Sequence, residues 1–303
     1  MKILAICLAL LSAVALAVGT QLQNGAVDVQ KRAALSGRSH LTLKQLLEVA
    51  KKPRWVSGLA VSAFALVLQF SALSLAPLIL VQPIGAIALV VTSVMNARIT
   101  KTKLNMASIY AITMSTVGLG AFVVMAHQVS VEPNIDDGAL IDILLMVAVL
   151  IGVFAFIFFK GSSRFNPLTF IIGAGALYGF VATLTKVVIK RAFSQGGFER
   201  LVALKFEFFT DGLTVLAIGA LITAALLGGW FVQNAYTSGP PDLVIAGLTV
   251  IDPLVAVSIG VVLLNEAMDA PLPIILGFGA SGAVAVTGVF LLSKYHPELL
   301  GKG

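Results

Sequence analysis

Long apolar stretches, separated by short polar linkers, follow one another along nearly the whole chain. Most contain 20 or more residues, the length that an α-helix needs to cross a bilayer, and they lack the ten-residue alternation of membrane β-strands. We therefore predict an all-α integral membrane protein with about nine transmembrane helices, at residues 2–27, 55–75, 77–98, 104–126, 139–159, 168–190, 203–232, 242–266 and 272–293.

The composition supports a membrane protein. Apolar residues make up 58% of the 303 residues and charged residues 11%, whereas soluble domains carry about 25% charged residues. The single cysteine, Cys7, excludes an internal disulfide and a cysteine-based metal site. We expect no metal cluster and no cofactor.

The basic residues predict the topology. Nine spans place the termini on opposite sides, and fourteen of the twenty Lys and Arg residues then share one side, seven of them in the linker 31–54. Because cytoplasmic loops are enriched in Lys and Arg, we expect the N-terminus outside and the C-terminus in the cytoplasm. The net charge of +6 thus reflects topology, and we expect no nucleic-acid partner.

The stretch from Leu243 to Glu266 contains an unusual pair, Asp252 and Pro253, near its middle. A carboxylate at mid-membrane depth costs about 2.5–3.5 kcal/mol, and proline disturbs the hydrogen bonding one turn earlier, at Thr249. Such groups usually face a cavity or another helix and mark a transport path. The alternative is a kinked helix with a buried, neutral Asp252.

An internal repeat relates the two halves. Gln82 and Pro83 lie 170 residues before Asp252 and Pro253, an offset of five predicted spans. An odd offset inverts the second copy, and inverted repeats alternate between inward-open and outward-open states around a midplane site. We predict repeats at 1–126, with four helices, and 139–303, with five, and expect Gln82 and Asp252 to share a central cavity.

Two segments carry a family resemblance. ALSLAPLILVQPIGAIALVVTSVMNARITKTKLN (72–105) and AYTSGPPDLVIAGLTVIDPLVAVSIGVVLLNEAM (235–268) resemble the drug/metabolite transporter (DMT) superfamily, in its EamA-like and NIPA-like branches of actinobacterial type. The resemblance implies an inverted-repeat bundle and secondary transport. The chain departs from the usual ten helices, since we expect its first half to be one helix short, and it carries Asn96 where the second copy has Glu266.

One polar face lies on the first helix. Gln21, Asn24 and Asp28 recur at helical spacing and so share a face. We interpret this face as the wall of a vestibule at the cytoplasmic end, or as a helix end that enters the interface.

The seventh helix opens with two acids four residues apart, Glu207 and Asp211. They predict either a cation or proton site, or ion pairs with Lys186 or Arg200 at the membrane edge. We interpret Glu266, at the end of the eighth helix, as a helix-end charge, with a gate as the alternative.

These features favour a secondary transporter of the cytoplasmic membrane that moves a small metabolite or drug, by proton-coupled efflux and alternating access, with Asp252 as proton carrier. The alternatives are a NIPA-like carrier of magnesium or another divalent cation, and a flippase or scaffold for a lipid-linked precursor. Nucleotide-binding and hydrolase motifs are absent from the sequence, so we expect no enzyme. The expected partners are a small-molecule substrate and the lipid bilayer, and a homodimer is left open.

Overall fold

The computed structural model describes residues 1–33, 52–100, 106–132, 135–161, 167–194, 211–238 and 241–295, which form helices and turns without a β-strand. The helices are α1 (Lys2–Ala33), α3 (Pro53–Leu75), α4 (Leu78–Val81), the 3₁₀ turn η1 (Pro83–Ala86), α5 (Ile87–Thr100), α6 (Met106–Val129), α7 (Asp137–Gly161), α8 (Pro167–Ser194), α10 (Gly212–Ser238), α11 (Pro241–Val262) and α12 (Leu272–Tyr295).

This confirms the predicted all-helical, multi-span architecture. Seven described helices are long and apolar enough to cross a membrane, and two shorter apolar ones, Leu78–Val91 and Gly247–Val262, complete the predicted order. Two boundaries were wrong: the third span is divided at Gln82–Pro83, where proline cannot donate to the helical ladder, and the eighth ends at Val262 rather than Glu266. The start of the seventh span, 203–210, lies outside the described residues.

Local chemistry explains several helix starts. Pro53, Pro167 and Pro241 each occupy the first residue of a helix, where the missing N–H has no intrahelical partner to lose. Asp136 Oδ1 accepts a hydrogen bond from the Ala139 N–H at 2.8 Å and so caps the first turn of α7.

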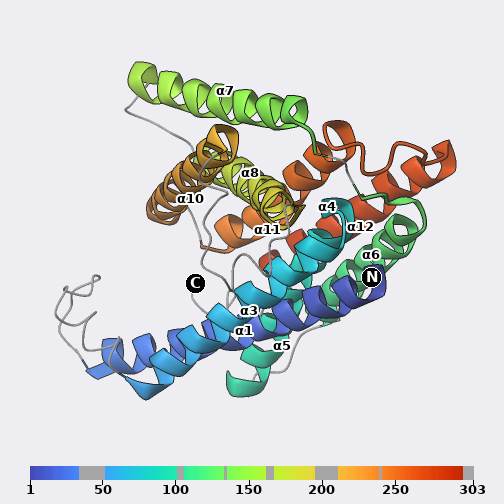
Figure 1. Cartoon of the computed structure of the whole chain (residues 1–303). Coiled ribbons are helices and arrows are strands. Elements are labelled where there is room, and N and C mark those ends of the chain that lie inside the picture. Colours follow the sequence, from blue (N-terminus) through green and yellow to red (C-terminus); the bar gives the residue numbers. More distant parts are fainter. Residues whose placement is uncertain are drawn as a thin grey trace.

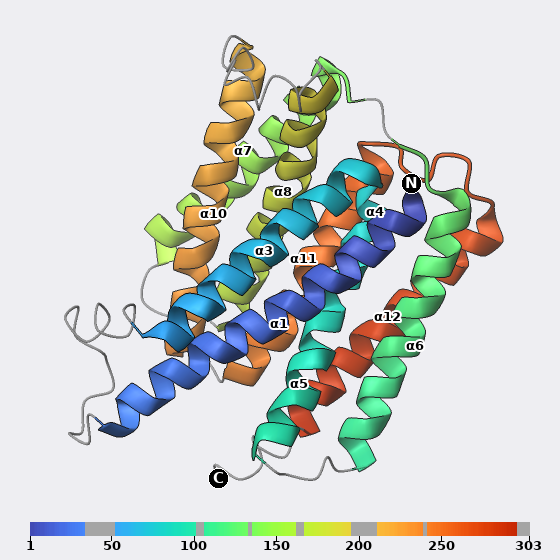
Figure 2. The same cartoon turned by 60° about the horizontal axis from the view of Figure 1, so that its bottom comes forward.

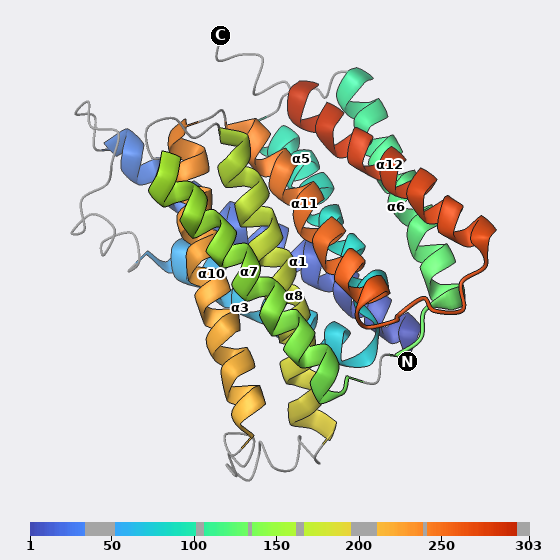
Figure 3. The same cartoon turned by 90° about the horizontal axis from the view of Figure 1, so that it is seen from above.

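The helices pack as pairs. α1 lies along α3, α6 along α12, and α8 along both α10 and α11 (Figures 1 and 2). Seen from above, the α6–α12 pair occupies one side of the bundle and α7, α8 and α10 the other (Figure 3). α11 lies between these two groups (Figure 3) and also contacts α4 and η1.

Large apolar side chains cover the outside of the bundle. Phe64 on α3, Leu145 on α7 and Leu226 on α10 are 54%, 58% and 71% exposed. Such a surface suits lipid, because a soluble protein rarely exposes apolar patches this extensive.

Candidate functional site

A cavity of about 330 Å³ lies between α1, α3, η1 and α11. The sequence-predicted residues Gln82, Asp252, Pro253 and Thr249 all line it, so the expected meeting of Gln82 and Asp252 is found. Pro83 lines a neighbouring cavity of about 100 Å³ that also touches Thr249 and Pro253. The remaining lining residues of the larger cavity are Ser12, Ala13, Leu16, Ala65, Leu66, Gln69, Gly85, Ala86 and Leu248.

Gln82 reaches the cavity from the junction between α4 and η1. Its backbone N–H donates to the Leu78 carbonyl at 2.9 Å, and its own carbonyl accepts from Gly85 at 3.1 Å. Pro83 follows and supplies no N–H, so the chain tightens into a 3₁₀ turn here. The residue is 8% exposed, and its amide side chain can both donate and accept.

Asp252 lies one residue before the proline inside α11. Its Oδ1 atom is buried and has no hydrogen-bond partner among the described residues. Leaving such an acceptor unmatched costs about 1–3 kcal/mol, and more when it is charged. Asp252 as a whole is half-buried and lines the cavity, so the unmatched oxygen lies beside the cavity, where a ligand could compensate the carboxylate.

Two glycines of α8 bring α11 close at this point. A Cβ on Gly175 would lie 2.7 Å from Ile251 Cβ and 3.4 Å from the Asp252 backbone nitrogen, and one on Gly179 would lie 2.7 Å from Val255 Cβ. The α8 backbone thus supports α11 directly behind Asp252.

Besides the carboxylate, the cavity offers other oxygen atoms that could act as ligands of a cation. Gln69, which the sequence analysis missed, contributes an amide from α3, and Ser12 Oγ donates to the Ala65 carbonyl at 2.8 Å. Among the described residues, no group of three or more His, Cys, Asp or Glu could hold a metal ion. A cation here would keep much of its water shell.

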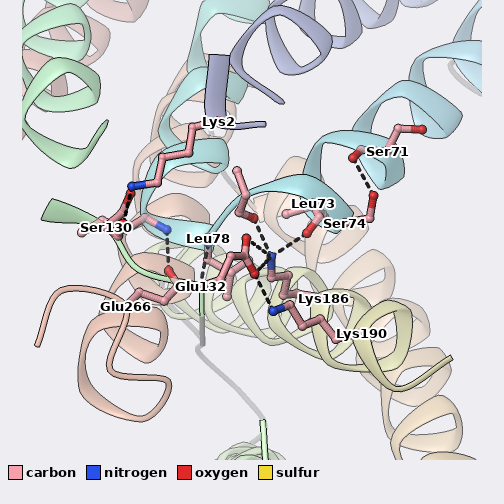
Figure 4. A network of polar contacts seen from close by, with 12 residues as sticks. Lys2, Ser71, Leu73, Ser74, Leu78, Ser130, Glu132, Lys186, Lys190 and Glu266 are labelled. Carbon is pink, nitrogen blue, oxygen red and sulfur yellow. Dashed lines mark hydrogen bonds and ion pairs between the residues drawn. The ribbon is translucent and has the colours of Figure 1, made fainter. Parts of the chain in front are cut away.

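A second polar cluster surrounds the two-residue turn Ala76–Pro77 between α3 and α4 (Figure 4). Lys186 Nζ donates to the carbonyls of Leu73 and Ala76 at 2.6 and 2.5 Å. The Glu266 carboxylate accepts from the N–H groups of Leu78 and Ile79 at 2.8 and 2.7 Å.

Both charged side chains of this cluster are 0% exposed. The interpretation of Glu266 as a helix-end charge was therefore wrong: it lies beyond α11 and folds back onto the start of α4. Glu132 compensates the lysines, at 3.3 Å from Lys186 and 2.6 Å from Lys190. A lysine inside the apolar run Leu168–Arg191 was the sequence signal for this cluster.

Asp211 belongs to a third cluster. Its Oδ2 lies 2.7 Å from Arg191 Nη2 and accepts from the Thr214 hydroxyl at 2.5 Å, while Arg191 Nη1 lies 2.7 Å from Asp137. The suggested partner Lys186 instead lies beside Glu132, Asp211 pairs with Arg191, and Arg200 lies outside the described residues. Asp211 does not line the cavity.

The Asp211 cluster should stabilise the ends of α7, α8 and α10. The hydrogen bonds from Thr214 and then Arg191 lower the pKa of Asp211 to about 2. Because this pKa lies below the unfolded value, the contribution of Asp211 to the free energy of unfolding is full above about pH 4 and is lost as the pH falls through about 2.

We expect Arg191→Met to lower the melting temperature at pH 7 by a few degrees, since partly exposed pairs contribute about 0.2–1 kcal/mol each.

Arg98→Met, at an exposed position of α5, is the matched control and should melt with the wild type. Equal melting temperatures for the Arg191 and Arg98 variants would show that the cluster contributes nothing.

The polar face on α1 and the acid Glu207 are placed only in part. Gln21 is partly buried and does not line the cavity. The side chains of Asn24 and Asp28, and all of Glu207, lie outside the described residues.

Comparison with known proteins identifies the family of this chain. The family described as magnesium transporter NIPA matches residues 2–296, nearly the whole chain. The chain belongs to the NIPA family. The predicted resemblance to the NIPA-like, DMT-type transporters is thereby confirmed, and the protein is a multi-pass membrane transporter by family.

Relatives of this NIPA-family chain are distant. An uncharacterized protein of Corynebacterium glutamicum is 27% identical over 267 residues, which cover 88% of this chain and 86% of that protein. A protein of Arabidopsis thaliana named "Probable magnesium transporter NIPA1" is 26% identical over 182 residues, 55% of this chain and 51% of its own length. No solved structure matches significantly.

Proposed function

We propose that this protein carries Mg²⁺ across the membrane through the cavity that Asp252 and Gln82 line. The observation that supports this most is the buried, unmatched Asp252 Oδ1, which a cation would satisfy. The NIPA family supports the choice of ion, because its description and that of the Arabidopsis relative both name magnesium.

The site suits a hydrated ion. Mg²⁺ dehydrates reluctantly and is usually held through one or two carboxylates and several waters, so a single acid is sufficient. Six waters at about 30 Å³ each occupy about 180 Å³, and the cavity measures about 330 Å³. The amide oxygens of Gln82 and Gln69 and the Thr249 hydroxyl would contact the water shell.

Transport would proceed by alternating access. The cavity lies between α1, α3 and η1 from the first half and α11 from the second, as expected for a site between inverted repeats at 1–126 and 139–303. The α1–α3 and α8–α10 pairs correspond in order, as do α6 and α12. In the cytoplasmic membrane, the distribution of basic residues favours an N-terminus outside, which places the α3–α4 turn at the outer face.

The test uses purified full-length protein in liposomes that contain a Mg²⁺-sensitive dye, challenged with Mg²⁺, Ca²⁺, Mn²⁺ and a panel of metabolites, with and without a pH gradient. We expect saturable Mg²⁺ entry that exceeds that of empty liposomes. Proton-driven movement of an organic solute without Mg²⁺ flux would overturn the proposal in favour of proton-coupled metabolite export.

A further inference from the structure

The α3–α4 turn is held by charges from the other half of the chain. A helix end leaves carbonyls without intrahelical donors, and a helix start leaves N–H groups without acceptors. At this turn Lys186 of α8 satisfies the carbonyls and Glu266 of the α11–α12 connection satisfies the N–H groups, from positions more than 100 residues away. We call Lys186 and Glu266 the clamp.

The backbone around the clamp leaves space for it. A Cβ on Gly260 would lie 2.6 Å from Glu266 Oε2, so only glycine at this position accommodates the carboxylate without displacement. The Val131 N–H donates to the Glu266 carbonyl at 2.8 Å, which joins the end of α6 to the same connection. Lys2 Nζ donates to the Ser130 carbonyl (Figure 4) and to the His127 carbonyl at 3.2 Å.

Directly beneath the clamp lies α4, a single turn that ends at the cavity. All four of its residues, 78–81, are 0% exposed, and Gln82 follows them into the cavity. Around α4, Ala9 of α1 and Ala72 of α3 are 1% and 0% exposed. Farther along the cavity, Leu16 is 39% exposed and Gly85 is exposed as well. Neither α4 nor the clamp lines the cavity, so fully buried side chains separate the cavity from the clamp.

A buried ion pair contributes little net stability compared with apolar residues of similar size, while removal of one partner is strongly destabilising. Charged groups that join two halves are therefore better suited to a contact that forms in one state and is released in another. When one repeat rocks against the other, contacts across the halves at one end must separate.

We propose that the clamp is the gate at this end of the cavity: Lys186 and Glu266 close it by binding the α3–α4 turn, and their release frees α4 and opens the cavity to that face. This inference rests on the proposed function, because a gate has a role only if the cavity carries a substrate. Its opening is measurable without any substrate, so failure of Mg²⁺ transport would leave this inference standing.

The experiment uses the full chain with Cys7→Ala and a single reporter, Gly85→Cys, whose Cβ would meet no atom within 4 Å. A membrane-impermeant thiol reagent is applied to spheroplasts and to inverted vesicles. A separate protein with Gly138→Cys serves as a side marker. Gly138 is exposed and follows Glu132 in the chain, so the preparation in which this cysteine is labelled is the one that presents the clamp side to the reagent. A closed gate predicts that the reporter reacts at least about tenfold more slowly from the clamp side than from the other side.

Three variants release the clamp in different ways: Glu266→Gln, Lys186→Met and Gly260→Ala, the last of which keeps every charge but displaces the carboxylate. Each should speed labelling from the clamp side at least about tenfold, which corresponds to roughly 1.4 kcal/mol in the closed-to-open equilibrium. Lys190→Met is the matched control, because Lys190 pairs with the same Glu132 carboxylate but is 28% exposed, whereas Lys186 is 0% exposed, and it should leave the rate unchanged.

Folding is checked by gel filtration. Unchanged clamp-side labelling in folded clamp variants would overturn the gate. If none of the variants folds, the parent reporter decides alone, because equal labelling rates from the two sides contradict a gate that is closed at this end.

Discussion

Asp252→Asn should reduce Mg²⁺ transport by about 10- to 100-fold while the protein remains folded. Asparagine keeps the shape of the side chain but removes the charge that attracts the cation. Interactions with a charged partner contribute about 1.5–3 kcal/mol, and each 1.4 kcal/mol is a factor of ten. Because Asp252 Oδ1 has no hydrogen-bond partner in the described structure, the substitution should not lower the melting temperature and is expected to raise it.

The opposite signs of these two effects separate a transport role from a structural one. Asp142→Asn, on the exposed face of α7, is the matched control and should transport like the wild type. Gln82→Leu should have a smaller effect, about 2- to 10-fold and mainly in KM, since it removes a neutral hydrogen bond. Wild-type transport by Asp252→Asn, or a large loss of its stability, would return Asp252 to a structural role.

The bundle itself was predictable because the bilayer imposes a length and a polarity on every span. The apolar runs predicted nine segments, and each contains a helix in the described part of the chain, although the third is divided and the eighth ends at Val262. The shared cavity of Gln82 and Asp252 was also predictable. A polar residue followed by proline is costly in a membrane helix, so its recurrence 170 residues later indicated two equivalent sites.

The clamp was not predictable in the same way. The sequence shows that Lys186 and Glu266 are costly to bury, but not which helix end compensates them. Their partners are backbone groups 110 to 188 residues away, and backbone groups carry no sequence signal. Gln69 was missed for a related reason, since a single amide on a lipid-exposed helix has no pattern until α11 is placed opposite it.

The unequal environments of the glycines likewise emerge only from packing. The glycines of α6 and α12 look interchangeable in the sequence, yet the structure divides them. A Cβ on Gly288 would lie 2.5 Å from the Ser115 nitrogen, and one on Gly118 would lie 2.6 Å from the Ala285 nitrogen. A Cβ on Gly120 or Gly279 would meet nothing within 4 Å.

Gly288→Ala and Gly118→Ala should therefore each lower the melting temperature in detergent by several degrees. The new methyl group meets backbone atoms, which cannot rotate away, so α6 and α12 must separate; overpacking of this kind costs about 1–3 kcal/mol, and each kcal/mol lowers the melting temperature by about 2–4 °C in a chain of this size. The double variant should lose more than either single one.

The matched controls predict the opposite sign. Gly120→Ala and Gly279→Ala lie on the same two helices, where alanine is the better helix former by up to about 1 kcal/mol, so both should be neutral or stabilising. Transport by folded protein should survive in all four single variants, because none of these glycines lines the Asp252 cavity. If Gly288→Ala melts with Gly279→Ala, the α6–α12 contact is looser than the structure describes, and the pair moves as two helices rather than as one unit during alternating access.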